Sequence, residues 1–83
     1  MNEAELERRV LDALYSVAPD AEGERLDPDV NFRDQLDIDS MDFLNFLVAV
    51  KEAVGVEVPE ADYALVATLH DCVRYLAKKL PMK

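Results

Sequence analysis

The sequence predicts an all-α fold: a small antiparallel helix bundle of three principal helices plus one short helix, with a long loop after the first helix. Three observations lead to this prediction. Apolar residues recur at intervals of three and four in both terminal segments. A central stretch, residues 40–54, contains neither Gly nor Pro. The Pro and Gly residues fall between these segments, where helices are expected to end.

Length and composition favour one soluble domain, which we expect to span residues 1–83. The apolar fraction of 51% is enough for one core, and the absence of Trp indicates that aliphatic side chains build it. Eighteen acidic residues against nine basic ones give a net charge of -9. This charge argues against nucleic acid or an anionic membrane surface as a partner. It suits basic protein partners, or solubility alone.

The single cysteine, Cys72, excludes an internal disulfide and a Cys/His metal cluster. No apolar run approaches the roughly 20 residues of a membrane span. The polar, acidic start "MNEAELERR" is unlike a signal peptide. We therefore expect a cytoplasmic protein without membrane insertion. Cys72 falls on the apolar face of the last helix and is predicted to be a core residue, whereas His70 is predicted to lie on the surface.

Residues 4–17 are predicted to form the first helix, ending before Pro19. Acidic residues crowd its first turn, where the helix dipole favours them. The apolar stripe that supports this helix comprises Leu6, Val10, Leu11, Leu14 and Val17.

Residues 18–39 show no sustained period and form the long loop, a length that is often functional in a compact domain. Apolar residues are spaced through it, namely Leu26, Val30, Phe32, Leu36 and Ile38. We therefore expect a loop held against the core. The stretch "DPDVNF", from Asp27, predicts a turn with one short helical turn.

Residues 40–54 are predicted to form the second helix, capped by Asp39 or Ser40 and ended by Gly55. Residues 43–50 would also suit a buried strand, but the length of the uninterrupted stretch favours a helix.

Pro59 followed by acids predicts a short third helix near residues 60–65. Thr68 is placed to cap the last helix, with Asp71 in a position like that of a capping box. Its apolar stripe consists of Leu69, Cys72, Val73, Leu76 and Leu80. Pro81 is expected to end it.

The second helix is apolar around nearly its whole circumference. We assign one face to the core, comprising Leu44, Leu47, Val50 and Val54, with Phe46 beside it. Met41 and Val48 then lie outside, and Phe43 falls between the two faces. Either this helix is covered on all sides, or it carries an exposed apolar strip, rimmed by Asp42 and Glu52, that docks another protein.

Ser40 stands between acids at the head of this helix. It is a poor nucleophile for catalysis, because nothing places His70 beside it and an anionic setting is the reverse of an oxyanion hole. "DIDSMD" is a poor calcium loop, because Asp42 stands where Gly is required. Ser40 is then either a simple cap or the substrate of another enzyme, since backbone N–H groups at a helix start tolerate an attached phosphate.

Four segments resemble the acyl carrier protein family. "DSMD" at 39–42 resembles the family's "DSL" signature, and "VEVPEADY" from Val56 resembles the "EIP"-type segment before the short third helix. "TLHDCVRYL" from Thr68 resembles the last helix, and "LDPDVNFRDQL" from Leu26 resembles the loop before the serine. The four segments occur in the family's order and cover essentially the whole chain.

This resemblance implies a carrier, not an enzyme. A phosphopantetheinyl transferase would use coenzyme A and Mg²⁺ to attach 4′-phosphopantetheine to Ser40, making a phosphoprotein. The arm's terminal thiol, which is not that of Cys72, would hold acyl groups as thioesters for acyl-loading and acyl-processing enzymes, and we expect a monomer. The partner-binding residues implied are Asp39, Met41, Asp42, Val48 and Glu52, with Glu60 and Asp62 as weaker candidates.

The chain departs from the fatty-acid carriers of the family at several positions. Asp37 replaces a common glycine, Met41 a leucine and Asn45 a common glutamate, and Lys51 adds a cation to a helix face that is usually acidic. These differences indicate a free-standing carrier of a specialised pathway of lipid metabolism, such as polyketide, lipid-tail or modified fatty acid biosynthesis. Asp37 and Ile38 differ from the "GG[HD]S" pattern of peptidyl carrier domains. That class and an unmodified helical adaptor remain as the alternatives.

Overall fold

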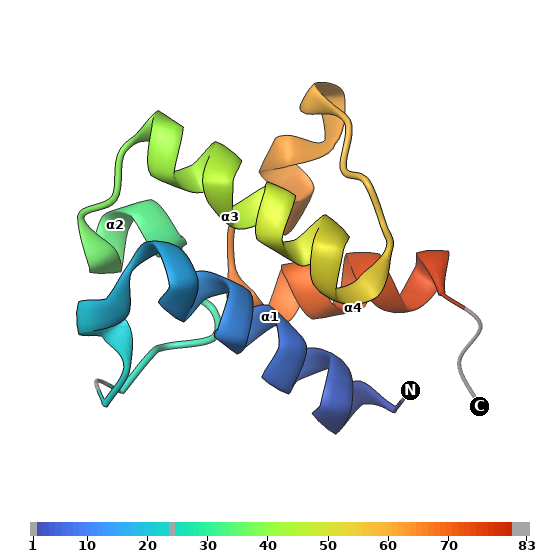
Figure 1. Cartoon of the computed structure of the whole chain (residues 1–83), viewed down its shortest axis with the longest axis horizontal. Coiled ribbons are helices and arrows are strands. Elements are labelled where there is room, and N and C mark those ends of the chain that lie inside the picture. Colours follow the sequence, from blue (N-terminus) through green and yellow to red (C-terminus); the bar gives the residue numbers. More distant parts are fainter. Residues whose placement is uncertain (1, 24, 81–83) are drawn as a thin grey trace.

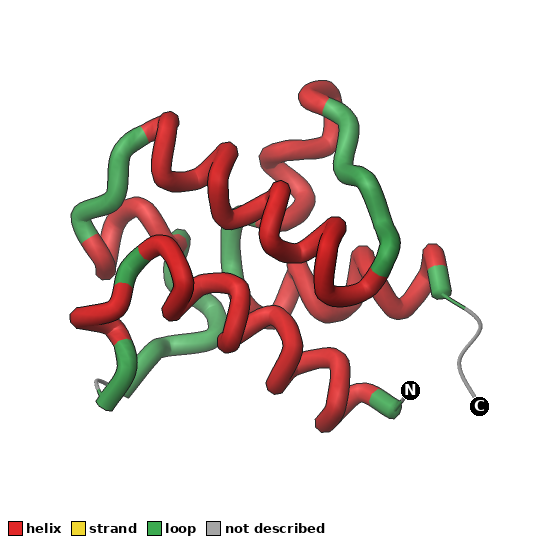
Figure 2. Tube along the Cα trace, in the orientation of Figure 1, coloured by secondary structure: helices red, strands yellow, loops and turns green. Residues whose placement is uncertain are grey.

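A computed structural model describes residues 2–23 and 25–80 (Figure 1). Within these ranges the chain is helical and contains no strand, which confirms the all-α class (Figure 2). The elements in chain order are α1 (Glu3–Val17), the 3-10 helix η1 (Pro19–Ala21), α2 (Phe32–Leu36), α3 (Ser40–Val54), the 3-10 helix η2 (Glu60–Val66) and α4 (Leu69–Lys79).

The core lies where α1 packs against α3 and α4, and α1 and α3 run in opposite directions (Figure 1). The largest side chains that are completely buried are Phe32, Phe46, Leu6, Leu14, Leu76, Val10, Val50, Val66 and Cys72. The expectation of an aliphatic core was therefore incomplete, because two phenylalanines occupy its centre. Their rings meet edge to face with centroids 5.2 Å apart, a favoured geometry for aromatic pairs.

Side-chain caps fix the starts of the helices. Asn2 Oδ1 accepts a hydrogen bond from the N–H of Glu5 at 2.8 Å, and Thr68 Oγ1 accepts one from the N–H of Asp71 at 3.0 Å. The predicted cap at Thr68 is confirmed. Gly55 ends α3 with a φ of 79°, a left-handed conformation that glycine adopts without the steric cost of a Cβ atom. Pro81, which was expected to end the last helix, lies outside the described residues.

The segment before α3 contains more helix than its sequence pattern predicts. The predicted turn lies at residues 28–30, and the short helical turn expected with it is replaced by α2, which begins at Phe32 and extends beyond the predicted stretch; η1 precedes the turn. Asn31 caps α2 by accepting a hydrogen bond from the N–H of Arg33 at 2.9 Å. The Gln35 amide binds the carbonyl oxygens of Asp27 and Val30, both at 2.9 Å. A helix of five residues is too short to show a hydrophobic period, which explains why it was missed.

The long loop is held against the core, as predicted. The N–H of Phe32 donates to the carbonyl oxygen of Ala67 at 2.8 Å, and the N–H of His70 donates to that of Pro28 at 2.9 Å. Phe32 and Ile38 are buried, although Val30 is exposed. The loop is therefore hydrogen-bonded to the segment where α4 begins, and it places α2 beside the start of α3.

One core assignment in α3 was wrong. Leu44 is 40% exposed, whereas Phe43, which the pattern did not assign, is buried. The Phe43 ring packs edge to face on Tyr63 of η2 with centroids 5.9 Å apart. This contact moves the centre of the buried sector towards Phe43, and Leu44 lies about 100° away around the helix. Met41 and Val48 are 64% and 55% exposed, so α3 is not covered on all sides.

Candidate functional site

The start of α3 is held by two reciprocal hydrogen bonds. Asp39 is the N-cap, and its Oδ1 accepts from the N–H of Asp42 at 2.8 Å. In return, Asp42 Oδ2 accepts from the N–H of Asp39 at 3.4 Å, which completes a capping box. This arrangement resolves the choice between Asp39 and Ser40: the aspartate is the cap. The Ser40 hydroxyl is not needed to hold the helix.

Ser40 is exposed and has a cationic neighbour, Arg33. The guanidinium of Arg33, in the first turn of α2, donates a hydrogen bond from Nη2 to Ser40 Oγ at 3.2 Å. The expectation of purely anionic surroundings was therefore wrong, and Arg33 was not among the predicted site residues. No periodic signal pairs the two residues, because the turn between α2 and α3 brings them together.

That turn depends on Asp37, which ends α2 with φ 53° and ψ 41°. This left-handed conformation suits glycine, and aspartate adopts it more readily than most residues. The structure therefore gives a physical reason why glycine suits this position. It also shows how the chain reverses between the side chains of Arg33 and Ser40.

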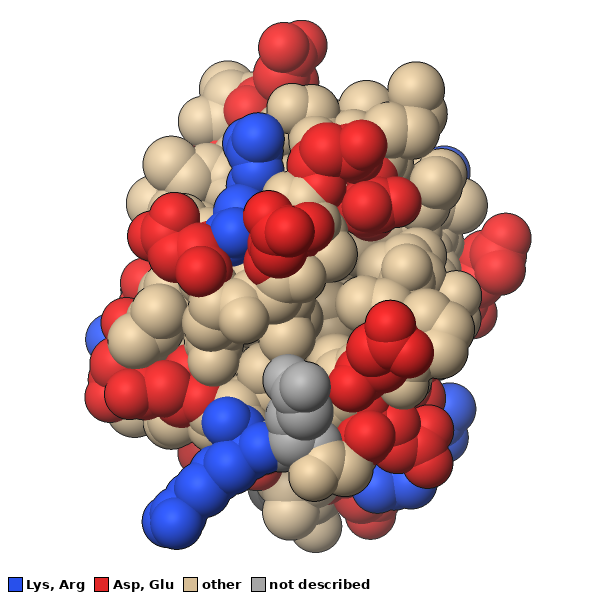
Figure 3. Space-filling view, turned by 90° about the vertical axis from the view of Figure 1, so that its left-hand side faces the viewer, with Lys and Arg blue, Asp and Glu red and all other residues tan. Residues whose placement is uncertain are grey.

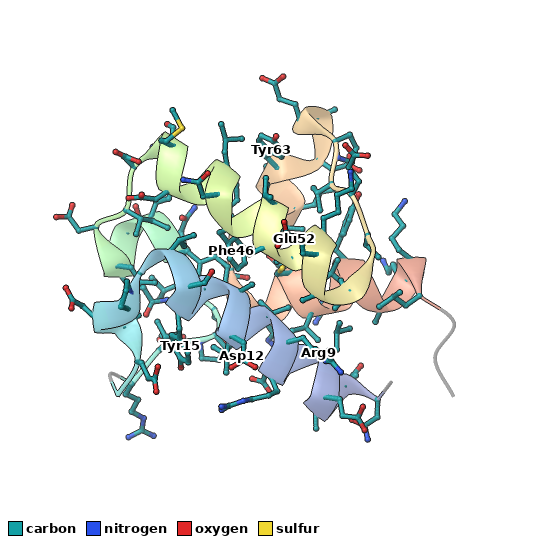
Figure 4. The ribbon with its side chains drawn as sticks, in the orientation of Figure 1. Arg9, Asp12, Tyr15, Phe46, Glu52 and Tyr63 are labelled. Carbon is teal, nitrogen blue, oxygen red and sulfur yellow. The ribbon has the colours of Figure 1, made fainter. Side chains whose placement is uncertain are left out.

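A cleft of about 430 Å³ opens beside the hydroxyl, between α2, α3 and η2. Phe43 and Leu44 supply apolar surface, while Arg33 and Glu60 supply charges of opposite sign. Tyr63, a residue of η2, completes the lining, and its side chain faces α3 (Figure 4). A smaller hollow of about 200 Å³ shares Arg33, Phe43 and Tyr63 with it. The cleft therefore combines an exposed hydroxyl, a cation and an apolar wall.

The outer face of α3 carries an apolar strip. Met41, Leu44 and Val48 are exposed and spaced by three and four residues, so they follow one line along the helix. Leu44 is the member that the sequence analysis missed. Asp39 and Glu52 are also exposed, and Figure 4 labels Glu52 on α3. More Asp and Glu than Lys and Arg are visible on the face seen in Figure 3.

Not every acidic candidate is equally available to a partner. Asp42 is half-buried and occupied by the capping box. Asp62 is also half-buried and accepts a hydrogen bond from the Tyr75 hydroxyl at 2.6 Å. Glu60 is exposed at the cleft. The unusual cation Lys51 lies 3.6 Å from the Glu57 carboxylate, which offsets its charge.

Cys72 and His70 lie where the sequence predicts, in the core and on the surface. Cys72 is completely buried, and desolvation raises the pKa of its thiol to about 12, so the reactive thiolate is disfavoured. His70 is exposed, and its Nδ1 lies 3.0 Å from Asp29 Oδ1. It contacts the loop before α2 and is not among the residues that line the cleft at Ser40.

Two further absences concern metal and membrane. Within the described part of the chain, no three His, Cys, Asp or Glu side chains are grouped so that they could hold a metal ion. No described helix combines the length and the apolar character that crossing a bilayer requires.

The fold and the exposed serine are those of a carrier domain, and comparison with known proteins agrees. The family model "Phosphopantetheine attachment site" matches residues 8–76. The chain is also similar to an acyl carrier protein of Thermobifida fusca (strain YX), with 31% identity over 75 residues that cover 87% of this chain and 95% of the relative. The chain therefore belongs to the acyl carrier protein family. It is a carrier and not a catalyst, and its cofactor is covalently attached 4′-phosphopantetheine.

The residues at the start of α3 fit such a group. A phosphodiester needs an accessible hydroxyl, and Ser40 is exposed. A nearby cation stabilises the negative charge of a phosphodiester, and the Arg33 guanidinium already donates to Ser40 Oγ, the atom that would become the ester oxygen. The start of a fifteen-residue helix also favours an anion through its dipole and its backbone N–H groups.

Proposed function

We propose that Ser40 is the attachment site and that the chain, as a single domain over residues 1–83, delivers acyl thioesters to partner enzymes. The observation that carries this proposal is the division of roles at the start of α3. Asp39 caps the helix, so the neighbouring Ser40 hydroxyl is exposed at the helix start and is not needed as the cap.

A phosphopantetheinyl transferase supplies the chemistry. In this reaction Ser40 Oγ forms a bond to the phosphorus that carries the pantetheine of coenzyme A, and the bond from that phosphorus to the rest of coenzyme A breaks. The serine proton passes to a base of the transferase. The capped helix keeps the hydroxyl in place while the transferase binds around it.

The exposed strip of Met41, Leu44 and Val48 is the proposed docking surface for the transferase and for acyl-loading and acyl-processing enzymes. Asp39 and Glu52 provide the acidic rim around it, with Glu60 across the cleft. A cargo tethered to its carrier reaches the partner's active site at high effective concentration, so weak docking is sufficient. Opposite charges raise the association rate and make it sensitive to salt.

The pathway that we propose is a specialised one, such as polyketide, lipid-tail or modified fatty acid assembly. Lys51 and its partner Glu57 alter the charge of the α3 surface, and Asn45 leaves out an acid there. Partners matched to this surface differ from those that require a uniformly acidic helix. We also propose that the protein acts as a monomer in the cytoplasm.

The deciding experiment is intact-mass spectrometry after incubation with a broad-specificity transferase, coenzyme A and Mg²⁺. We expect one added phosphopantetheine per chain, and none on Ser40→Ala with an unchanged circular dichroism spectrum. An unmodified mass with several transferases would instead favour an unmodified helical adaptor. The mass of the protein isolated from its own host would identify the acyl cargo and hence the pathway.

A further inference from the structure

Arg33 is oriented toward Ser40 although carboxylates surround this part of the chain. Within the described residues the ion pairs are Arg8–Asp12, Lys51–Glu57 and His70–Asp29, and Arg33 belongs to none of them. Its side chain donates to a neutral hydroxyl at 3.2 Å. A guanidinium has five N–H donors in a planar fork, and a single hydroxyl uses few of them.

The position of Arg33 is fixed by its neighbours along α2. Phe32, the preceding residue, is completely buried against Phe46 and donates its N–H to Ala67. The N–H of Arg33 itself binds the Asn31 side chain. The base of this long side chain is therefore held before any ligand arrives, which reduces the entropy lost on binding.

We propose that Arg33 is the phosphate-binding residue of this carrier: its guanidinium holds the phosphodiester that joins the arm to Ser40. The inference rests on the proposed attachment at Ser40 and adds a role to a residue outside the serine signature. Guanidinium and phosphate groups match in geometry, and their charge-assisted hydrogen bonds are shorter and stronger than neutral ones.

The proposal also explains how an anion is tolerated here. Asp37, Asp39 and Asp42 are close to Ser40 in the chain, and Glu60 lines the same cleft. A phosphodiester adds a further negative charge to this group. Among the described residues that line the cleft, Arg33 is the one cation, so it offsets that charge at the edge of the cleft, where the arm begins.

The test compares wild type, Arg33→Gln, Arg33→Lys and Arg9→Gln. Arg9 is an exposed residue of α1, and Figure 4 labels it away from the start of α3, so Arg9→Gln removes the same charge elsewhere. Each protein is loaded to completion with the transferase, and its mass confirms one phosphopantetheine. The readouts are the ³¹P chemical shift of the phosphodiester and the change in melting temperature on loading.

We expect the ³¹P resonance of Arg33→Gln to move relative to wild type and Arg9→Gln, with Arg33→Lys between them. At low salt, loading should lower the melting temperature of Arg33→Gln by about 2–4 °C relative to its effect on wild type. At 1 M NaCl this difference should vanish, because screening weakens an exposed ion pair.

The outcomes separate the two proposals. Identical ³¹P shifts and identical loading effects for Arg33→Gln and Arg9→Gln would overturn the role of Arg33, while the added mass would leave the attachment at Ser40 intact. An absence of added mass on wild type, or its presence on Ser40→Ala, would overturn the attachment itself and the Arg33 proposal with it.

Discussion

The Asp39 carboxylate accepts a hydrogen bond from the backbone N–H of Asp42 at 2.8 Å, and this contact starts α3 immediately before the serine. The two residues therefore have separate tasks: Asp39 stabilises the helix, and Ser40 is available for modification. Asp39→Ala should destabilise the protein by about 1 kcal/mol through loss of the cap, whereas Asp39→Ser should retain most of it.

Ser40→Ala is the matched control, with an expected change within about 0.5 kcal/mol. Urea denaturation followed by circular dichroism measures all three variants. A larger loss for Ser40→Ala than for Asp39→Ala would show that the serine is the cap after all.

The turn between α2 and α3 requires a left-handed residue at Asp37, with φ 53°. Asp37→Ala should cost about 1 kcal/mol, because a Cβ atom without a local hydrogen-bonding group is disfavoured in this region. Asp37→Gly should be neutral or stabilising, since glycine removes that cost. Thermal unfolding of the three proteins side by side tests the order, and equal stability of the Ala and Gly variants contradicts it.

The buried sector of α3 is centred near Phe43 and Phe46, with Leu44 outside it. Phe46→Ala should cost about 3–5 kcal/mol because it leaves a cavity at the centre of the core. Leu44→Ala, at a side chain that is 40% exposed, should cost less than about 1 kcal/mol. Denaturant midpoints distinguish the two, and a large loss for Leu44→Ala would restore the original assignment of this residue to the core.

The Cys72 thiol should be unreactive in the folded protein. Burial raises its pKa to about 12, and alkylation requires the thiolate. The unmodified protein should therefore resist iodoacetamide at pH 8 until urea unfolds it, while the loaded protein should gain one label per chain, on the arm. Stoichiometric labelling of the folded, unmodified protein would contradict this prediction.

Stability should also depend on the ionisation of Cys72. Its folded pKa of about 12 exceeds the ordinary value of 9.0, so the unfolded state releases the proton first. The stability that this thiol contributes is complete below pH 9 and is lost as the pH rises towards 12. Cys72→Ala should show a smaller loss over the same window, measured as melting temperature against pH.

The exposed strip on α3 should control association with the transferase. Val48→Ala should lower the kcat/KM of the transferase about tenfold, because the proposed docking surface covers this exposed side chain. Leu65→Ala is a close control, because Leu65 has the same exposed fraction of 55% but belongs to η2. Equal effects of the two substitutions would mean that docking is not centred on α3.

Much of the fold could be predicted from local signals. The spacing of apolar residues indicates the long helices. Gly55 ends α3 and Thr68 caps the start of α4, as predicted. The net charge argued against a nucleic-acid partner, whereas the carrier role and its cofactor were implied by the resemblance of four segments to the acyl carrier protein family. The short helix α2 was missed because it is held by hydrogen bonds between the side chains of Asn31 and Gln35 and nearby backbone groups, which no periodic pattern of apolar residues indicates.

Only the tertiary structure decided what surrounds the serine. The sequence by itself determined the helical class, the helix ends and the residue that carries the family's signature, because these depend on residues a few positions apart. The contact between Arg33 and Ser40, the exposure of Leu44 and the cleft bounded by Tyr63 arise where α2, α3 and η2 pack together. Such contacts depend on the direction of side chains across packed elements, which a one-dimensional pattern does not contain.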